Sequence, residues 1–191
     1  MSTTSIGPAG ERKSNEVRPL LPDSGSDTTL AMAESLSDVA IQLMKEAYMH
    51  QMRGDLHLAV ELYKRSIEIY PTAEAHTFLG WTYRFMDKLE DAIAECKRAI
   101  EVDPSFGNPY NDIGAYLIEL GELDSAIPWL EKATLSARYE AYHYPWYNLG
   151  RIYLAKEMYS MGRACFQKSL DIEPRYTLAE EALEKVRRLL Q

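Results

Sequence analysis

Apolar residues recur at steps of three and four positions along most of the chain after residue 39. That spacing places them on one face of an α-helix. Short breaks such as Gly54-Asp55 and Gly121-Glu122 interrupt the pattern, and prolines follow several of its segments. Because glycine favours turns and proline stops helices, the pattern predicts an all-α chain built from pairs of short helices.

The helix pairs form an internal repeat, because the chain aligns with itself at offsets of 33 to 36 residues. Small residues then recur at two places in each unit, where they would let two helix backbones approach closely. They are Ala47, Gly80, Gly114 and Gly150 at the first place, and Ala59, Ala92, Ala126 and Gly162 at the second. We therefore divide the chain into four units, 40–72, 73–106, 107–142 and 143–175. The alternative is an irregular helical bundle with a chance pattern.

The junction after the third unit departs from the repeat. Pro71, Pro104 and Pro174 end the other units, whereas Arg138 stands at that place in the third. The spacing to the fourth unit is also longer. We expect residues 136–145 either to bulge or to extend a helix.

Two segments carry a resemblance to a known family. They are Pro109-Tyr110-Asn111-Asp112-Ile113-Gly114-Ala115-Tyr116 and Trp146-Tyr147-Asn148-Leu149-Gly150-Arg151-Ile152-Tyr153. Both resemble the first helix of the tetratricopeptide repeat (TPR), a helix-turn-helix unit of 34 residues. The resemblance implies a short, bacterial protein made only of this repeat, folded as a right-handed superhelical solenoid of four helix pairs. It also implies a concave groove, lined by the first helices, that binds a peptide or a segment of a partner protein.

The two ends of the chain lie outside the repeat. Residues 1–27 contain three prolines and few apolar residues, so too little can be buried to offset the entropy of ordering, and we expect a disordered tail. Residues 28–39 are expected to form a lead-in helix or a linker. Residues 176–191 are predicted to form a capping helix, because the end of a solenoid otherwise exposes apolar surface. Four residues share the apolar face of that helix, namely Leu178, Leu183, Val186 and Leu190.

Composition excludes several classes of protein. The 191 residues carry a net charge of −8, which argues against a nucleic-acid surface because phosphates require clustered Lys and Arg. The longest apolar runs have four residues, too few for a membrane span or a signal peptide. The two cysteines cannot form a disulfide framework, so we expect a reducing compartment and a cytoplasmic protein.

Candidate partner-binding residues lie on the inner face of each first helix, projected at ~100° per residue. They are Lys45, Tyr48, Phe78, Trp81, Phe85, Asn111, Asp112, Glu119, Tyr144, Asn148 and Arg151. The aromatic residues of the second unit form an apolar surface opposite its packed side, which indicates a binding surface. The alternative is that neighbouring helices, or residues 30–39 folding back, cover them. Asparagine amides can donate to and accept from a peptide backbone.

We therefore expect an adaptor or scaffold whose partner contributes apolar anchors and a basic residue, which would face Asp112 and Glu119. The alternative is a structural protein that self-associates through the aromatic groove or the C-terminal helix. Chaperone-binding members of the family carry a carboxylate clamp of Lys, Asn and Arg side chains. The corresponding residues in the two possible registers are Met44, Tyr48, Phe78, Asn108 and Asp112, or Thr77, Trp81, Asp112, Tyr144 and Asn148. Neither set is basic, so an acidic chaperone tail is not the expected partner.

No catalytic, metal or cofactor site is predicted. The four histidines lie far apart, without metal-ligand spacing to one another or to a cysteine. His76 is expected to be a buried histidine of the core, and Cys96 and Cys165 to be small core residues. The sequence contains no phosphate-binding glycine loop and no nucleophile motif, so we do not expect an enzyme.

Overall fold

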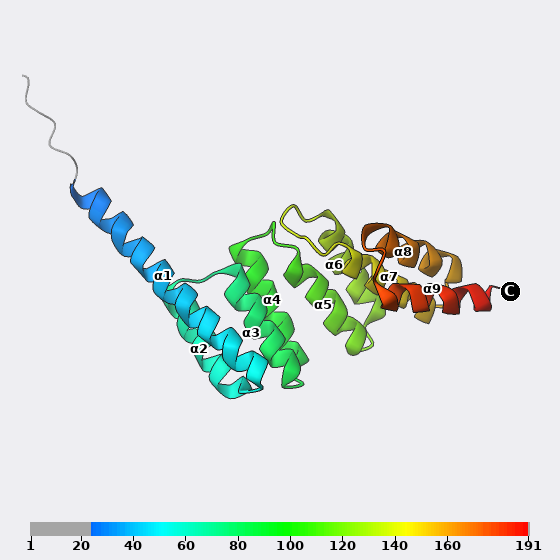
Figure 1. Ribbon diagram of the computed structural model, residues 1–191, viewed down its shortest axis with the longest axis horizontal. Helices are drawn as coiled ribbons and strands as arrows, with labels where there is room; N and C mark the ends of the chain where they lie inside the picture. The colour runs from blue at the N-terminus through cyan, green and yellow to red at the C-terminus, as the bar shows by residue number, and fades with distance from the viewer. Residues whose placement is uncertain (1–23, 191) are drawn as a thin grey trace, which may run out of the picture.

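The structure, a computed structural model, describes residues 24–190, without the side chains of residues 24–28, 30 and 31. Over this range the chain forms nine α-helices and no strand longer than an isolated bridge (Figure 1), so the predicted all-α class is confirmed. The helices are α1 Ser24–Arg53, α2 Leu56–Ile69, α3 Ala73–Phe85, α4 Leu89–Val102, α5 Asn108–Glu119, α6 Leu123–Leu135, α7 His143–Ala155, α8 Tyr159–Ile172 and α9 Thr177–Leu189.

The helices stack as consecutive pairs along the length of the molecule (Figure 1). Helices α1 and α2, α3 and α4, α5 and α6, and α7 and α8 pack within pairs, and each second helix also contacts the first helix of the next pair. The first helices α1, α3, α5 and α7 contact one another in sequence, whereas within residues 24–190 no two second helices touch. The first helices therefore form the inner layer of the solenoid and the second helices the outer layer.

Small residues allow the close packing within each pair. A Cβ atom added to Gly150 in α7 would lie 2.5 Å from Cε1 of Phe166 in α8. One added to Gly162 in α8 would lie 3.3 Å from the carbonyl oxygen of Gly150. The two small positions of this unit thus face each other, as the repeat pattern predicts.

The turns within the helix pairs use the left-handed region of the backbone. Gly54 and Gly121 have φ values of +86° and +79°. Asp87 and Glu157 occupy the matching places in the second and fourth units, with φ values of 57° and 59°. The turn geometry is therefore shared by all four units, although only two of them use glycine.

The core contains the histidine and the cysteines that the sequence assigns to it. His76 is buried, and its Nδ1 lies 2.7 Å from Oε2 of the buried Glu95. Cys96 and Cys165 are buried free thiols within one hydrophobic cluster that runs from the second pair through the third to the fourth. Burial raises the pKa of the Cys96 thiol well above its ordinary value.

The N-terminal region differs from the prediction. Helix α1 begins at Ser24 and runs without a break to Arg53, so the expectation of disorder is wrong for residues 24–27. Residues 28–39 are helical, and they do not fold back over the aromatic residues. Residues 40–53 pack against α2, and further turns add to an existing helix at low cost. Figure 1 shows this N-terminal half of α1 projecting beyond α2. The rest of the expected tail, residues 1–23, lies outside the described residues.

The junction after the third unit bulges and does not extend a helix. The Arg138 amide donates to the Ser105 carbonyl, and the Gly107 amide donates to the Arg138 carbonyl, each at 3.0 Å. The Arg138 guanidinium stacks on the Phe106 ring, 4.0 Å from its centroid, and pairs with Glu74 and Asp103 at 2.6 and 2.7 Å. Residues 136–142 are thereby held against the loop that precedes α5.

Helix α9 packs on α8 at the C-terminal end (Figure 1). Leu183 and Val186 are buried in one cluster with Phe166. Leu178 and Leu190 are 48% and 43% exposed, so the expectation that they share the packed face is wrong. Within residues 24–190, α9 contacts α8 and α7 alone, and its apolar stripe is covered along its middle and not at its ends. No helix in the described part of the chain is long and apolar enough to cross a lipid bilayer.

Candidate functional site

An aromatic cluster of Tyr48, Phe78 and Trp81 lies on the inner layer where α1 meets α3. The ring centroids of Tyr48 and Phe78 are 5.7 Å apart, and those of Phe78 and Trp81 are 5.1 Å apart in an edge-on arrangement. The ring of the buried Tyr63 in α2 packs against the Phe78 ring, with their centroids 6.2 Å apart. Neighbouring helices therefore cover part of this cluster, while Tyr48 keeps 39% of its surface exposed.

A row of hydrogen-bonded polar residues continues from this cluster across α5 and α7. Trp81 Nε1 donates to Asp112 Oδ2 at 2.5 Å, and Asn111 Nδ2 donates to Asp112 Oδ1 at 3.4 Å. Asn148 Nδ2 then donates to Asn111 Oδ1 at 3.1 Å, and Arg151 Nη1 donates to Asn148 Oδ1 at 3.0 Å. We call these five residues the polar row. It joins three first helices in one continuous network.

Asp112 is the one residue of the polar row that has a carboxyl group. Burial raises its pKa from 3.8 to about 7, although the hydrogen bonds from Trp81 and Asn111 oppose the shift. Burial raises the pKa values of the Cys96 thiol and of the Tyr116 and Tyr139 phenols, and the charge of Asp112 raises them further. Because these groups are uncharged at neutral pH, none of them supplies a counter-charge.

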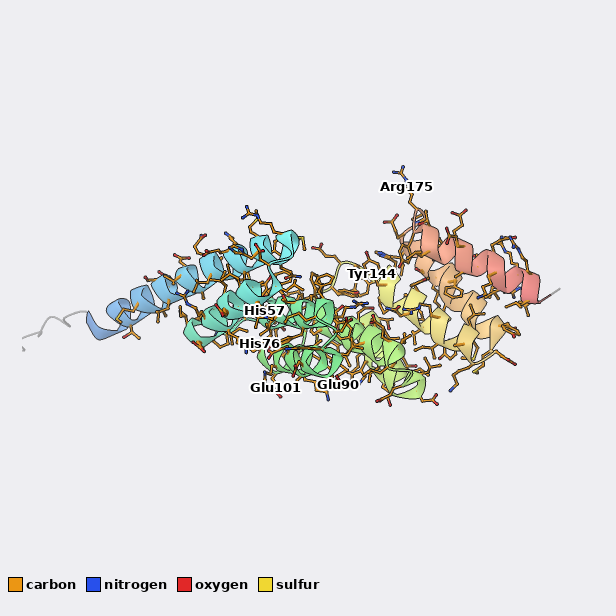
Figure 2. The ribbon with its side chains drawn as sticks, turned by 90° about the horizontal axis from the view of Figure 1, so that it is seen from below. His57, His76, Glu90, Glu101, Tyr144 and Arg175 are labelled. Carbon is orange, nitrogen blue, oxygen red and sulfur yellow. The ribbon has the colours of Figure 1, made fainter. Side chains whose placement is uncertain are left out.

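A cavity of about 280 Å³ opens beside Asp112. Three aromatic rings line it, from Trp81 of α3, Tyr139 of the bulged connection and Tyr144 of α7. The remaining lining residues are Asn108, Asn111, Asp112 and Ala141. We call this cavity the Asp112 pocket. Figure 2 shows Tyr144 near the middle of the solenoid, on the side opposite Glu90 and Glu101 of the outer helix α4.

Further aromatic rings continue the inner surface towards the C-terminal end. Tyr176 stacks edge-on against Tyr144 and Tyr147, with centroids 5.5 and 5.1 Å apart. The Arg151 guanidinium lies 5.9 Å from the centroid of the Tyr147 ring. On the C-terminal side of the groove, the side chains of Tyr144 and Arg151 are therefore packed against neighbouring aromatic rings.

The structure thus brings most of the predicted candidates together, in three connected groups. The aromatic cluster, the polar row and the Asp112 pocket contain Tyr48, Phe78, Trp81, Asn111, Asp112, Tyr144, Asn148 and Arg151. Lys45 and Phe85 are exposed and belong to none of the three. Glu119 forms an ion pair with Arg84 at 3.1 Å, so part of its charge is already neutralised within the chain.

Sequence reasoning missed Tyr139, Arg84 and Tyr176. Tyr139 lies within the irregular junction, which the repeat alignment treats only as a departure from the pattern. Arg84 and Glu119 are 35 residues apart, close to one repeat, so a search for opposite charges one period apart could have found them. Tyr176 belongs to the turn before the capping helix, and no repeat position marks it.

No group of three or more His, Cys, Asp or Glu side chains placed to hold a metal ion occurs in the described part of the chain.

Comparison with known proteins defines the class. The chain matches the Tetratricopeptide repeat family at residues 73–106, 108–138 and 144–176, which together make up just over half of its length. The chain therefore belongs to the tetratricopeptide repeat family. Residues 40–72, the first predicted unit, lie outside these matches.

Two curated relatives match part of the chain. Protein SGT1 homolog of Oryza sativa subsp. japonica is 37% identical over 78 residues, which cover 40% of this chain and 21% of the relative. Heat shock protein STI1 of Saccharomyces cerevisiae is 30% identical over 81 residues, covering 41% of this chain and 14% of the relative. The chain spans no more than about a fifth of the length of either relative.

Solved structures share the fold. Pseudomonas aeruginosa pilF superposes with a TM-score of 0.72 at 22% identity, over 81% of this chain and 68% of that one. YrrB, described as a TPR protein with an unusual peptide-binding site, superposes with a TM-score of 0.63 at 18% identity, over 84% of this chain and 86% of that one. At these identities the likeness shows the fold alone.

Proposed function

We propose that the protein is a non-enzymatic adaptor that binds an extended segment of a partner protein on the inner layer of the solenoid. The observation that carries the proposal is the continuous surface made by the aromatic cluster and the polar row, which meet at Trp81. Such a surface offers apolar anchor sites at one end and hydrogen-bonding groups along the rest. A peptide strand needs both, because its backbone is polar and its side chains supply most of the affinity.

The two asparagines of the polar row suit a peptide backbone. An amide side chain has two N–H donors and two acceptor lone pairs. In both Asn111 and Asn148, one donor and one lone pair are used within the row. Each residue therefore keeps one donor and one acceptor, the complement of a single peptide group, although only 9% of Asn111 and 6% of Asn148 is exposed, so a peptide would reach them at the edge of the row.

The aromatic cluster supplies the anchor sites. Aromatic side chains dominate the energetics of protein interfaces, and truncation of a true hot spot costs about 2 kcal/mol or more. Tyr48 and Trp81 lie on either side of Phe78, so an apolar side chain of the partner could contact two rings at once. We therefore expect Phe78 and Trp81 to carry more of the affinity than the exposed Lys45 and Phe85.

The partner is proposed to present a basic residue and not an acidic tail. Asp112 lies in the middle of the inner surface, at a position that belongs to the carboxylate clamp in either register, and a carboxylate there would repel an acidic ligand. The peptide-binding description of YrrB supports a peptide as the class of ligand. We place this binding in the cytoplasm, where Cys96 and Cys165 stay reduced.

Affinity capture from a lysate of the source organism tests the proposal. We expect the wild-type protein to retain a partner that the Phe78→Ala/Trp81→Ala variant does not retain. Trp129→Ala is the matched control, because it removes a half-buried tryptophan from the outer helix α6. Circular dichroism must show that all variants are folded. Equal capture by the groove variant and the control would contradict the proposal.

Self-association is the second candidate function, and exposed apolar residues at both ends of the solenoid favour it. Met32, Leu36 and Val39 are exposed on the projecting half of α1, and Leu189 and Leu190 are exposed at the C-terminal end of α9 and directly after it. Light scattering would then show a mass that rises with concentration, and a chain ending at Pro174 would lose the contribution of α9. A constant monomeric mass would exclude this candidate.

A further inference from the structure

We infer that the Asp112 pocket receives the positively charged end of a lysine or arginine side chain from the partner, with Asp112 as its counter-ion. The inference rests on the proposed function, because it assigns one part of the groove to one kind of partner residue. It specifies the chemical class of the ligand, the site and the groups that hold it.

The shape and the walls of the pocket suit a single cationic side chain. Its volume of about 280 Å³ is slightly below the range of drug-sized ligand sites, roughly 300–1,000 Å³. The rings of Trp81, Tyr139 and Tyr144 line it. A cation within about 6 Å of such a ring is attracted by its negative face, and the attraction grows where water is excluded. The aliphatic stem of lysine or arginine can pack on the same rings.

The charge balance of the pocket also favours a cation. Among the described residues that line it, Asp112 is the only one with an ionisable carboxyl or amino group. The basic residues nearby are engaged elsewhere. Arg138 pairs with Glu74 and Asp103, Arg84 pairs with Glu119, and Arg151 donates to Asn148. Asp112 receives hydrogen bonds from Trp81 and Asn111 but has no cationic partner within the described chain.

The pocket is held in place by close packing as well as by side-chain chemistry. Tyr139 lies so close to Gly107 that a Cβ atom added to Gly107 would be 2.5 Å from its Cβ and Cγ. The backbone bridge between Phe106 and Arg138 fixes the same connection. Tyr139 also stacks edge-on against Tyr142, whose hydroxyl donates to the Ser136 carbonyl at 2.6 Å. The wall that Tyr139 provides is therefore part of the folded structure before any ligand binds.

Titration with small probes under NMR observation tests the inference without a known partner. The probes are the Nα-acetyl amides of lysine, arginine, norleucine and glutamate. The protein has three tryptophans, so its three indole N–H signals are resolvable, and a Trp81→Phe variant assigns the one that donates to Asp112. We expect the lysine and arginine probes to shift the Trp81 signal saturably, and the norleucine and glutamate probes to leave it unchanged.

Two variants connect that response to the pocket. Asp112→Asn keeps the size of the side chain and an acceptor for Trp81, and it should weaken the lysine response about tenfold or more. Tyr144→Leu keeps apolar bulk but removes one ring, so it should weaken the response less. Glu131→Gln makes the same change of charge on the outer helix α6, where Glu131 is exposed, and should leave the response intact.

The outcomes separate this inference from the proposed function. An equal response to norleucine, a response to glutamate, or no response to lysine and arginine would overturn the cation site. A full lysine response from Asp112→Asn would overturn it as well. If the partner of the capture experiment binds Asp112→Asn as well as wild type, the groove function stands and the cation site does not. If lysine binds but groove variants retain every partner, the cation site stands and the groove function fails.

Discussion

The carboxyl group of Asp112 should make the stability of the protein depend on pH. Burial raises its pKa from 3.8 to about 7. Between these values the folded protein holds a proton that the unfolded chain has released, so the free energy of unfolding falls as the pH rises through this interval and levels off above it. The Asp112→Asn variant has no titrating group at this position, so its free energy of unfolding lacks this dependence on pH. From pH 5 to pH 8, wild type should lose on the order of 1–3 kcal/mol more than the variant.

Urea unfolding of both proteins at several pH values measures this difference. Every other titrating group is common to the two chains, so the difference between the curves reports Asp112 alone. Parallel curves would show that Asp112 is fully ionised in the folded protein across this range.

Gly150 should tolerate no side chain. A Cβ atom there would meet the Phe166 ring at 2.5 Å, and Phe166 is fully buried. Gly150→Ala should therefore cost about 1–3 kcal/mol of stability through overpacking. Gly121→Ala is the control, because Gly121 has open space around its Cα and a φ of +79°, and its cost should be the ~1 kcal/mol of a left-handed residue. Thermal unfolding that ranks Gly150→Ala as the milder change would contradict this packing.

At the scale of elements, α9 is expected to stabilise the solenoid through the middle of its apolar stripe. Leu183 is 5% exposed and packs with Phe166 and Val186, whereas Leu189 on the same helix is 48% exposed. Leu183→Ala should destabilise the protein by about 2–4 kcal/mol, and Leu189→Ala by less than ~1 kcal/mol. Chemical denaturation measures both. Similar costs for the two leucines would mean that α9 does not pack on α8 in this register.

The helices themselves could be predicted from sequence, because their causes are local and periodic. Apolar spacing predicts the helix pairs, and the recurring small residues predict the contact of Gly150 with α8. The start of α1 could not be predicted in this way. Its first turns carry no repeat signal, and they extend a helix whose packed part lies further along the chain.

At the scale of the whole molecule, helical projection alone predicts which residues lie on the inner surface but not how they interact. The polar row depends on contacts between successive repeats, such as Asn148 with Asn111, 37 residues apart. One wall of the Asp112 pocket is formed by Tyr139, which lies in the irregular connection between α6 and α7. Ordinary repeat positions do not encode either feature, because each follows from how neighbouring units stack.

Photo-crosslinking in the source organism tests the central claim, that the partner binds on the inner layer, most directly. Tyr144 on the inner layer and Tyr70 at the end of the outer helix α2 are both 43% exposed, so they form a matched pair for replacement by p-benzoylphenylalanine. We expect irradiation to link a partner protein to the chain substituted at Tyr144 and not to the chain substituted at Tyr70. Crosslinks that form only at Tyr70, equally at both sites, or at neither site would contradict binding on the inner layer.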